Sequence, residues 1–265
     1  RLILIDRDVV EESNLQSQLY DEKDVGVPKV VVAKKFIKKI NPEIEIENYF
    51  EHLDYDNIKI KADVILDCTD NLDTRFLINE FSLKNKIPFI YGSVIRDKGY
   101  VFVVAKKGPC LKCIFKDAKT TETCETSGIL NTVANTVASL QANECIKLLT
   151  NKKYEKDLLY VNLRENVIEK IKVKKNEKCI ACNGKFEYLS GKKKIDLVRY
   201  CSSGTYLIKK DFDFNEARER LKKLGYRNYK DAIIFDKMII FKNSVLIKAH
   251  SEKEALGLFS KYIGN

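Results

Sequence analysis

The sequence predicts an open α/β sheet followed by a small α+β domain, and three observations lead to this prediction. Apolar runs alternate with amphipathic helical segments over residues 1–105, which is the pattern of a β-α-β sheet. The apolar run at residues 64–66 is followed by Asp-Cys-Thr-Asp-Asn at residues 67–71, and open α/β sheets bind ligands where their strands end. From residue 195 onward the pattern changes to strand, helix, two strands and helix, with apolar faces of its own.

The first expected strand, at residues 2–6, ends in Asp6, the position of the carboxylate that holds a ribose hydroxyl in dinucleotide-type folds. The strand, glycine-rich turn and helix that usually come before it are not in the sequence. We therefore expect an N-terminally incomplete nucleotide fold whose affinity for ATP is negligible. Pro28 favours a helix start, so Lys29 would lie at a helix N-terminus, a natural anion site.

The remaining elements follow in order. Helices are expected at residues 30–40, 76–84 and 131–150, and strands at 44–49, 63–67 (the central one), 89–92 and 99–105. Residues 154–174 predict two antiparallel strands. The last region predicts a strand at 198–208, a helix at 215–224, strands at 232–235 and 238–247, and a helix at 252–263. We therefore divide the chain into a domain at residues 1–184 and a small basic domain at residues 185–265.

Composition and charge narrow the class of protein. The chain of 265 residues is 45% hydrophobic and 32% charged, and no apolar run approaches the ~18 residues of a membrane span. We expect a cytoplasmic protein without a membrane partner. Residues 1–183 hold 30 basic and 28 acidic side chains, whereas residues 184–265 hold 18 and 10. A basic tail can dock nucleic acid or an acidic protein, or it can be a solvated lysine-rich face.

Four of the eight cysteines form two Cys-x-x-Cys pairs, Cys110 with Cys113 and Cys179 with Cys182, and 65 residues separate the pairs. Two short thiolate loops of this kind make a closed tetrahedral zinc site. Cys124 lies in a polar loop just before an expected helix, where a thiolate is favoured, although Glu122 and Glu125 oppose this. Cys68 is in an apolar segment and is expected to be packed.

The segment at residues 67–71 allows two interpretations. Its carboxylates and amide can coordinate a metal or order a phosphate site. Alternatively, the segment is a strand-to-helix turn in which Asp70 or Asn71 caps the helix.

Together, these motifs resemble the ThiF/MoeB/HesA family. The resemblance covers residues 1–183 and rests on Asp6 and Asp8, Ser-Asn-Leu-Gln at residues 13–16, Gly-x-Pro-Lys at residues 26–29, residues 67–71 with Arg75, the paired cysteines, and the helix that ends near Leu149. It implies a Rossmann-like open sheet of the ubiquitin-activating type. It also implies an adenylyltransferase that uses Mg-ATP to activate the C-terminal glycine of a ubiquitin-like sulfur-carrier protein ending in Gly-Gly.

The resemblance assigns roles to individual residues. Asp6 would hold the ribose, and Ser13, Asn14 and Lys29 would belong to the nucleotide site, with Asn14 and Lys29 reaching the phosphates. Asp70, with Asn71, would place Mg²⁺ where pyrophosphate departs. Cys124 would lie where some members use a cysteine to take the activated carrier or its sulfur.

Two departures keep alternatives open. Ser17 replaces an arginine common in the family, and the glycine-rich loop is absent from the sequence. A catalytically inactive fold that binds a carrier protein or RNA is the first alternative, and an NAD-dependent oxidoreductase is the second. The leading prediction is an adenylyltransferase with ATP, Mg²⁺ and Zn²⁺, a homodimer like its relatives, with nucleic acid a less favoured partner.

Overall fold

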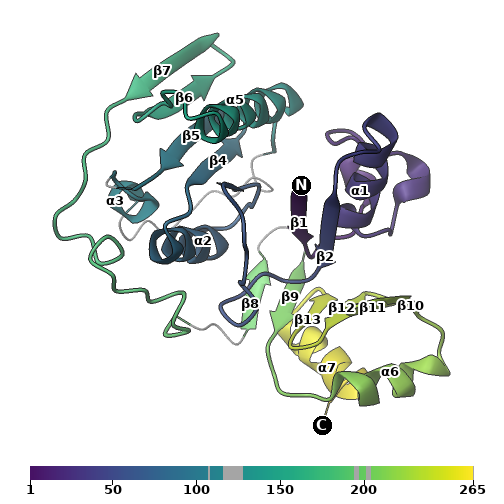
Figure 1. The fold of residues 1–265 in the computed structure, drawn as a ribbon. Coiled ribbons are helices and arrows are strands. Elements are labelled where there is room, and N and C mark those ends of the chain that lie inside the picture. Colours follow the sequence, from purple (N-terminus) through teal and green to yellow (C-terminus); the bar gives the residue numbers. More distant parts are fainter. Residues whose placement is uncertain (107, 116–127, 194–196, 201–203, 265) are drawn as a thin grey trace. The chain divides into compact units, whose positions relative to one another are not determined.

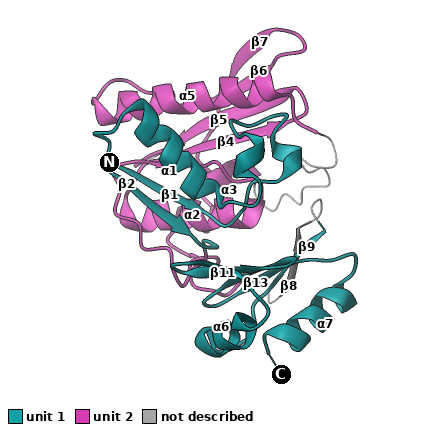
Figure 2. Ribbon diagram, turned by 90° about the vertical axis from the view of Figure 1, so that its right-hand side faces the viewer, with its two compact units in different colours: residues 1–53, 195–265 teal, residues 54–194 magenta. Residues whose placement is uncertain are grey.

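The computed structural model describes residues 1–106, 108–115, 128–193, 197–200 and 204–264 (Figure 1). The chain forms two compact units (Figure 2). Unit 1 comprises Arg1–Leu53 and Ile195–Asn265, and unit 2 comprises Asp54–Lys194. Unit 1 is therefore built from two segments that are distant in the sequence.

The N-terminal part of unit 1 is a β-α-β element. Strand β1 (Leu2–Asp6) pairs in parallel with β2 (Ile46–Phe50), so that Asp6 is opposite Phe50. Helix α1 (Lys29–Ile40) connects them after two short 3₁₀ turns, η1 (Glu12–Asn14) and η2 (Glu22–Asp24). Pro28 is the N-cap residue of α1, and Asn41, just before Pro42, is its C-cap, as the restriction that proline places on its neighbours favours.

The C-terminal part of unit 1 is a six-stranded antiparallel sheet with the order β10-β11-β12-β13-β9-β8. Its strands are β8 (Leu197–Tyr200), β9 (Thr205–Ile208), β10 (Arg227–Tyr229), β11 (Ala232–Phe235), β12 (Met238–Phe241) and β13 (Val245–Lys248). Helices α6 (Phe214–Lys222) and α7 (Glu252–Tyr262) share one apolar core with this sheet. Asp213 and Ser251 cap the two helices by accepting hydrogen bonds from backbone N–H groups.

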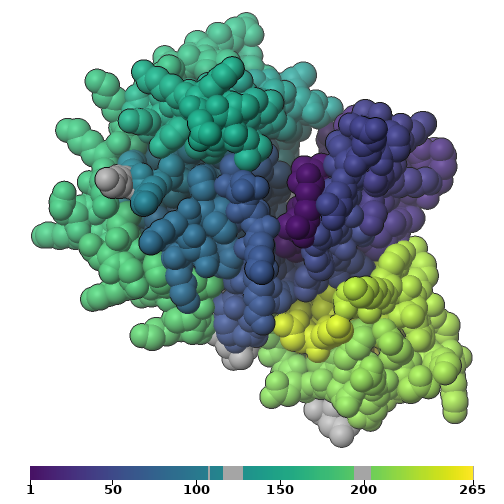
Figure 3. All heavy atoms as spheres, viewed as in Figure 1, coloured from purple at the N-terminus to yellow at the C-terminus, as the bar shows by residue number. Residues whose placement is uncertain are grey.

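The two parts of unit 1 share a second core. Val30 of α1 and Phe50 of β2 pack with Leu207, Phe241 and Leu246 of the six-stranded sheet. The ring of Phe50 meets that of Phe241 edge to face, with centroids 5.5 Å apart. In Figure 3 the blue N-terminal and yellow-green C-terminal residues of this unit adjoin one another. The C-terminal sheet therefore buries apolar side chains of the β-α-β element.

Unit 2 contains a five-stranded sheet with the order β3-β4-β5-β6-β7. Its strands are β3 (Ile65–Leu66), β4 (Phe89–Ile95), β5 (Lys98–Val104), β6 (Leu158–Asn162) and β7 (Val167–Ile171). Only β3 and β4 pair in parallel. Its helices are α2 (Leu72–Asn85), α3 (Leu111–Phe115) and α5 (Asn131–Leu149). Val133 and Val137 of α5 pack on the sheet with Ile90, Val101 and Val161.

Most of the expected elements are present, and three differ. The expected central strand at residues 63–67 is only two residues long and lies at the edge of the described sheet, because β1 and β2 form a sheet of their own. The expected strands at 198–208 and 238–247 each contain two antiparallel strands. Strand β10 was not expected. Across the described residues, no helix is long and apolar enough to cross a membrane.

Candidate active site and metal centre

In unit 1, the carboxyl end of β1 holds a cluster of charged side chains. One carboxylate oxygen of Asp6 accepts the backbone N–H of Asp8 at 2.9 Å. Asp8 in turn lies 3.5 Å from the Lys29 ammonium group, and its carbonyl accepts the Lys29 N–H at 2.9 Å. The first residue of α1 is therefore fixed beside the end of β1. Among the described residues, nothing donates to the second carboxylate oxygen of Asp6.

Burial sets the electrostatics of this cluster. It raises the pKa of Asp6 to about 6, and the negative charge of Asp8 adds to this, whereas Lys29 opposes it. Burial by itself would lower the pKa of Lys29, but the carboxylates of Asp8 and Asp6 outweigh it and raise that pKa. Tyr20 lies close enough for its pKa to respond to the same groups, and burial raises it. The cluster thus holds a cation and a carboxylate that is costly to ionise.

The predicted phosphate-site residues of the following loop take part in a short-range turn. The backbone N–H of Glu11 donates to the side-chain oxygen of Asn14 at 3.0 Å. The hydroxyl of Ser13 donates to Glu11 at 3.5 Å. These contacts order the loop, and they leave the amide N–H₂ of Asn14 without a partner among the described residues.

In unit 2, the loop after β3 is fixed by a buried ion pair. Asp67 is buried, and its carboxylate accepts the N–H of Thr69 at 2.9 Å and the Thr69 hydroxyl at 2.7 Å. Nε of Arg75 lies 3.2 Å from Asp67, and the guanidinium also donates to the carbonyls of Thr69 and Gly92. Burial raises the pKa of Asp67, and Arg75 opposes this. The loop is therefore tied to the first turn of α2.

Gln141 of α5 holds the same loop from the other side. Its side-chain N–H₂ donates to the carbonyls of Asp67 at 2.8 Å and Ile90 at 3.1 Å, and Gln141 is buried. Any Cβ at Gly92 would lie less than 3.0 Å from the Gln141 amide, so glycine is needed for this close approach. Gln141 thus connects the carboxyl end of β3 and the start of the neighbouring parallel strand β4 to α5.

Asp70 and Asn71 are placed by this network. The side-chain oxygen of Asn71 accepts the N–H of Thr74 at 2.9 Å, so Asn71 is the N-cap of α2, as the capped-turn interpretation predicted. Its amide N–H₂ donates to Asp70 at 3.3 Å. Asp70 is exposed, and no cation of the described residues lies within ion-pair distance of it. Cys68 is exposed as well, so the prediction that it is packed was wrong, because its neighbour Asp67 is the inward residue.

The predicted site residues thus fall into two groups. Asp6 and Lys29 lie together in unit 1 with Ser13 and Asn14 in the same unit, and Asp70 and Asn71 lie together in unit 2. Cys124 lies outside the described residues, so its role stays a prediction.

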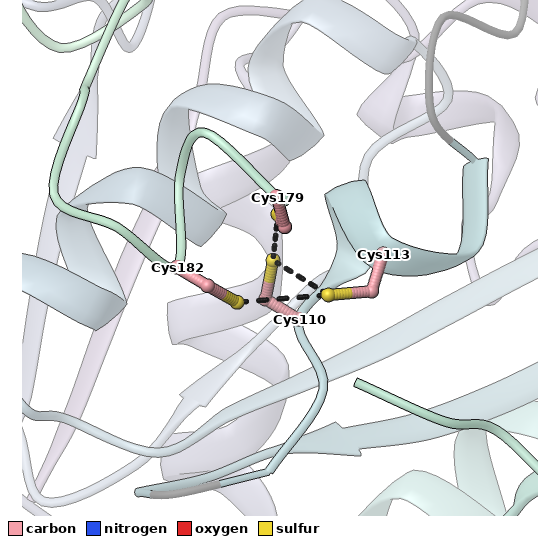
Figure 4. Close-up of side chains that lie close together, drawn as sticks. All are labelled: Cys110, Cys113, Cys179 and Cys182. Carbon is pink, nitrogen blue, oxygen red and sulfur yellow. Dashed lines mark hydrogen bonds between the residues drawn. The ribbon is translucent and has the colours of Figure 1, made fainter. Parts of the chain in front are cut away.

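The four paired cysteines converge in unit 2 (Figure 4). Their sulfur atoms all lie within 4.8 Å of one another. Cys110 is 3.6 Å from Cys179 and 3.9 Å from Cys113, and Cys113 is 3.6 Å from Cys182. Four sulfurs held tetrahedrally at about 2.3 Å from a zinc ion would be separated by about 3.8 Å, so the arrangement fits this metal.

The thiols need a cation to ionise together. Hydrogen bonding with Cys182 and then burial raise the pKa of Cys110, and burial raises that of Cys179 to about 11. Thiolates are the metal-binding form of cysteine. A divalent cation among the four sulfurs would compensate these effects by favouring the charged thiolates.

Helix α2 supports both cysteine loops. The side-chain oxygen of Asn79 accepts the N–H of Leu111 at 2.9 Å, between the first two cysteines. The Glu80 carboxylate accepts the N–H groups of residues 187, 188 and 189 at 3.2, 2.9 and 2.9 Å, just after the second pair. Lys112 is buried, and its ammonium group lies 5.1 Å from the ring centre of Phe76 and 5.6 Å from that of Tyr188. Helix α2, whose N-cap is Asn71, therefore also holds the cysteine centre.

Sequence reasoning missed Gln141 and Glu80 as structural supports. A signal for Gln141 was present, because it follows Val133 and Val137 at intervals of four residues and so falls on the buried face of a helix. A polar residue on such a face indicates a buried hydrogen-bond partner. The sequence offers no comparable signal for Glu80, since α2 is buried over eight consecutive residues.

The fold and the two groups of side chains define an α/β protein with charged clusters at the ends of its parallel strands and a four-cysteine centre. Residues 1–181 match the ThiF family, and the chain belongs to this family. The sulfur carrier protein ThiS adenylyltransferase of Bacillus subtilis is 30% identical over an alignment of 285 positions, which covers 98% of this chain and 84% of that protein. The SAMP-activating enzyme E1 of Haloferax volcanii is 33% identical over an alignment of 190 positions, which covers 68% of this chain and 70% of that protein. The predicted class, an adenylyltransferase of the ThiF/MoeB type, is confirmed by these relatives.

Solved structures agree on the fold. The crystal structure of E. coli MccB with ATP matches with a TM-score of 0.58 and 23% identity over 68% of this chain. This chain spans 58% of the length of MccB. At this identity the likeness shows the fold alone.

Proposed function

We propose that this protein adenylates the C-terminal glycine of a ubiquitin-like sulfur-carrier protein. In this reaction the glycine carboxylate bonds to the α-phosphorus of ATP, the bond from that phosphorus to the bridging oxygen breaks, and pyrophosphate leaves. The product is a carrier-AMP anhydride. No protein base is required, because the attacking carboxylate is already ionised, so the protein contributes positioning and charge neutralisation.

The observation that carries this proposal is the way the loop at residues 67–71 is built. Asp67, Arg75 and Gln141 are used to fix the loop, whereas Asp70 is left exposed beside Asn71. An exposed carboxylate at the end of a parallel strand suits a Mg²⁺ ion bound to phosphates. The Bacillus subtilis relative supports the same reaction, since its name is that of an adenylyltransferase of the sulfur carrier protein ThiS.

Unit 1 offers groups that suit the ribose and the phosphates of a nucleotide. The second oxygen of the Asp6 carboxylate is available for a ribose hydroxyl, as in other folds of this kind. Lys29 lies at the first turn of α1, where backbone N–H groups and the helix dipole also favour a phosphate. The amide N–H₂ of Asn14 is a further donor. When bound, Mg²⁺ would neutralise charge on the departing pyrophosphate.

The test is carrier-dependent pyrophosphate exchange in the full-length protein. Asp70→Ala should reduce the exchange rate by at least a hundredfold while leaving the unfolding transition unchanged, because a carboxylate that positions the metal acts mainly in the transition state. Asp63→Ala is the matched control, since Asp63 is also exposed in unit 2 and lies before β3. An exchange rate in Asp70→Ala equal to that of the control would refute the assignment. If the wild-type protein itself shows no exchange, the result would favour the alternative that this protein binds a carrier without catalysing adenylation.

We also propose that the four cysteines hold one structural Zn²⁺ ion. The support is the sulfur geometry, in which three measured separations of 3.6, 3.6 and 3.9 Å bracket the tetrahedral value. Such a site stabilises the fold and leaves no coordination position for a substrate. Elemental analysis should find one zinc per chain in protein prepared without chelator, and its absence would contradict the proposal.

A further inference from the structure

The loops beside the cysteine centre line an open hollow that the proposed adenylation does not use. Its volume is about 610 Å³, within the range of ligand-binding pockets. Three lysines line it, Lys84 from the last turn of α2 and Lys185 and Lys192 from the segment after the second cysteine pair. Its apolar lining comes from Ile180, Phe186 and Leu189. The hollow therefore combines ammonium groups with an apolar surface that includes one aromatic ring.

The positive charge of this hollow is not balanced by nearby acids. Glu187 is the acidic residue of its lining, and it pairs with Lys112 at 3.7 Å and Lys193 at 3.6 Å. Within the described ranges, no carboxylate lies within 4.0 Å of the ammonium groups of the three lining lysines. Residues 170–193 contain eight lysines and two glutamates. The hollow thus opens within a strongly basic stretch, which includes the green residues at the left edge of Figure 3.

The walls of the hollow are fixed before any ligand binds. Residues 187–189 are held to α2 by their three backbone hydrogen bonds to Glu80. Ile180 lies between two of the clustered cysteines. A preorganised site loses less conformational entropy on binding than a flexible one. This rigidity separates the hollow from an ordinary solvated lysine face.

We propose that this hollow binds a strand of single-stranded nucleic acid. Phosphates would contact Lys84, Lys185 and Lys192, and a base would stack on Phe186. Proteins that bind single strands combine a basic groove with aromatic rings in this way. A nucleotide carries a flat apolar base beside its charge, whereas an acidic peptide has carboxylates without such a group. The size of the hollow suits a strand better than the surface of a folded protein.

The test is fluorescence anisotropy of a labelled 12-nucleotide RNA of mixed sequence, titrated with zinc-loaded full-length protein at several KCl concentrations. In single strands each neutralised phosphate contributes about 0.7 to the slope of log K against log salt. The variant Lys84→Gln/Lys185→Gln/Lys192→Gln should therefore lower the slope by about 2 and weaken binding at least tenfold at low salt. Phe186→Leu should weaken binding at least fivefold, through lost stacking, without changing the slope.

The matched control removes three exposed lysines from the C-terminal part of unit 1, with the substitutions Lys223→Gln, Lys237→Gln and Lys253→Gln. RNA binding that falls equally in this control and in the triple variant of the hollow would overturn the proposal. Competition by a poly-glutamate 12-mer as effective as competition by unlabelled RNA would assign the hollow to an acidic protein instead. Full displacement by AMP alone would make it a mononucleotide site. Pyrophosphate exchange should be unchanged in the triple variant, so this test is independent of the proposed adenylation.

Discussion

Replacing Gly92 by alanine should disturb the buried network behind the Asp70 loop. The new methyl group would lie less than 3.0 Å from the Gln141 amide, so the Gln141 side chain must move. It would then lose its hydrogen bonds to the carbonyls of Asp67 and Ile90, at 2.8 and 3.1 Å. The Ile90 carbonyl still accepts the N–H of Asp67 at 2.9 Å, so the Asp67 carbonyl is the one left without a donor, at a cost of about 1–3 kcal/mol. With about 1 kcal/mol more for the lost second hydrogen bond to Ile90, Gly92→Ala should lower the free energy of unfolding by roughly 2–4 kcal/mol.

A double-mutant cycle isolates this cause. In a Gln141→Ala background the methyl group meets no amide, so Gly92→Ala should cost little there, and the coupling free energy should be about 2 kcal/mol or more. Urea unfolding followed by circular dichroism measures each corner of the cycle. Gly257→Ala in α7 is the control, because a Cβ there meets nothing within 4 Å and should be neutral or slightly stabilising. Costs at Gly92 and Gln141 that add within about 0.5 kcal/mol would refute the reasoning.

Three further predictions test other parts of the molecule. Asp6→Asn should stabilise the protein at pH 7.5 by on the order of 3 kcal/mol, because folding raises the pKa of Asp6 from 3.8 to about 6 and so disfavours its charged form. This advantage should vanish as the pH falls from about 6 toward 3.8, and an equal difference at both ends of that window would contradict it. Cys182→Ser should lower the zinc content measured by elemental analysis and cost several kcal/mol of stability in thermal unfolding, on the order expected for loss of a structural site. Glu80→Gln should expose the segment at residues 186–193 to limited proteolysis, because an amide places a donor against backbone N–H groups; unchanged cleavage kinetics would show that the three hydrogen bonds do not hold the segment.

Short-range signals predicted much of the fold. The strand that ends at Asp6 and the helix that begins after Pro28 follow from local preferences, as does the two-residue loop between β11 and β12, where Asp236 has a positive φ of 50°. The cysteine spacing likewise predicted which four sulfurs converge. These features depend on neighbours along the chain.

The contacts that support the site could not be predicted in the same way. Gln141 and Asp67 are 74 residues apart, and Glu80 and Tyr188 are 108 apart, so no local pattern specifies their meeting. The edge position of β3 depends on which strands pair, because an apolar run of this length fits an edge as well as a centre. Asp70 and Asn71 could therefore be predicted as site residues from the sequence, whereas the long-range contacts that hold their loop could not.

The discontinuous construction of unit 1 has a consequence for synthesis of the protein. Val30 and Phe50 complete their core only with residues such as Leu207 and Phe241, which leave the ribosome much later. The roughly 140 residues in between take about 7–28 s to add at about 5–20 residues per second. During that interval the β-α-β element carries an uncovered apolar face, whereas unit 2 is a single continuous segment that is complete when the interval ends. Nascent chains arrested before residue 195 should therefore be clients of chaperones that bind exposed apolar segments near the N-terminus.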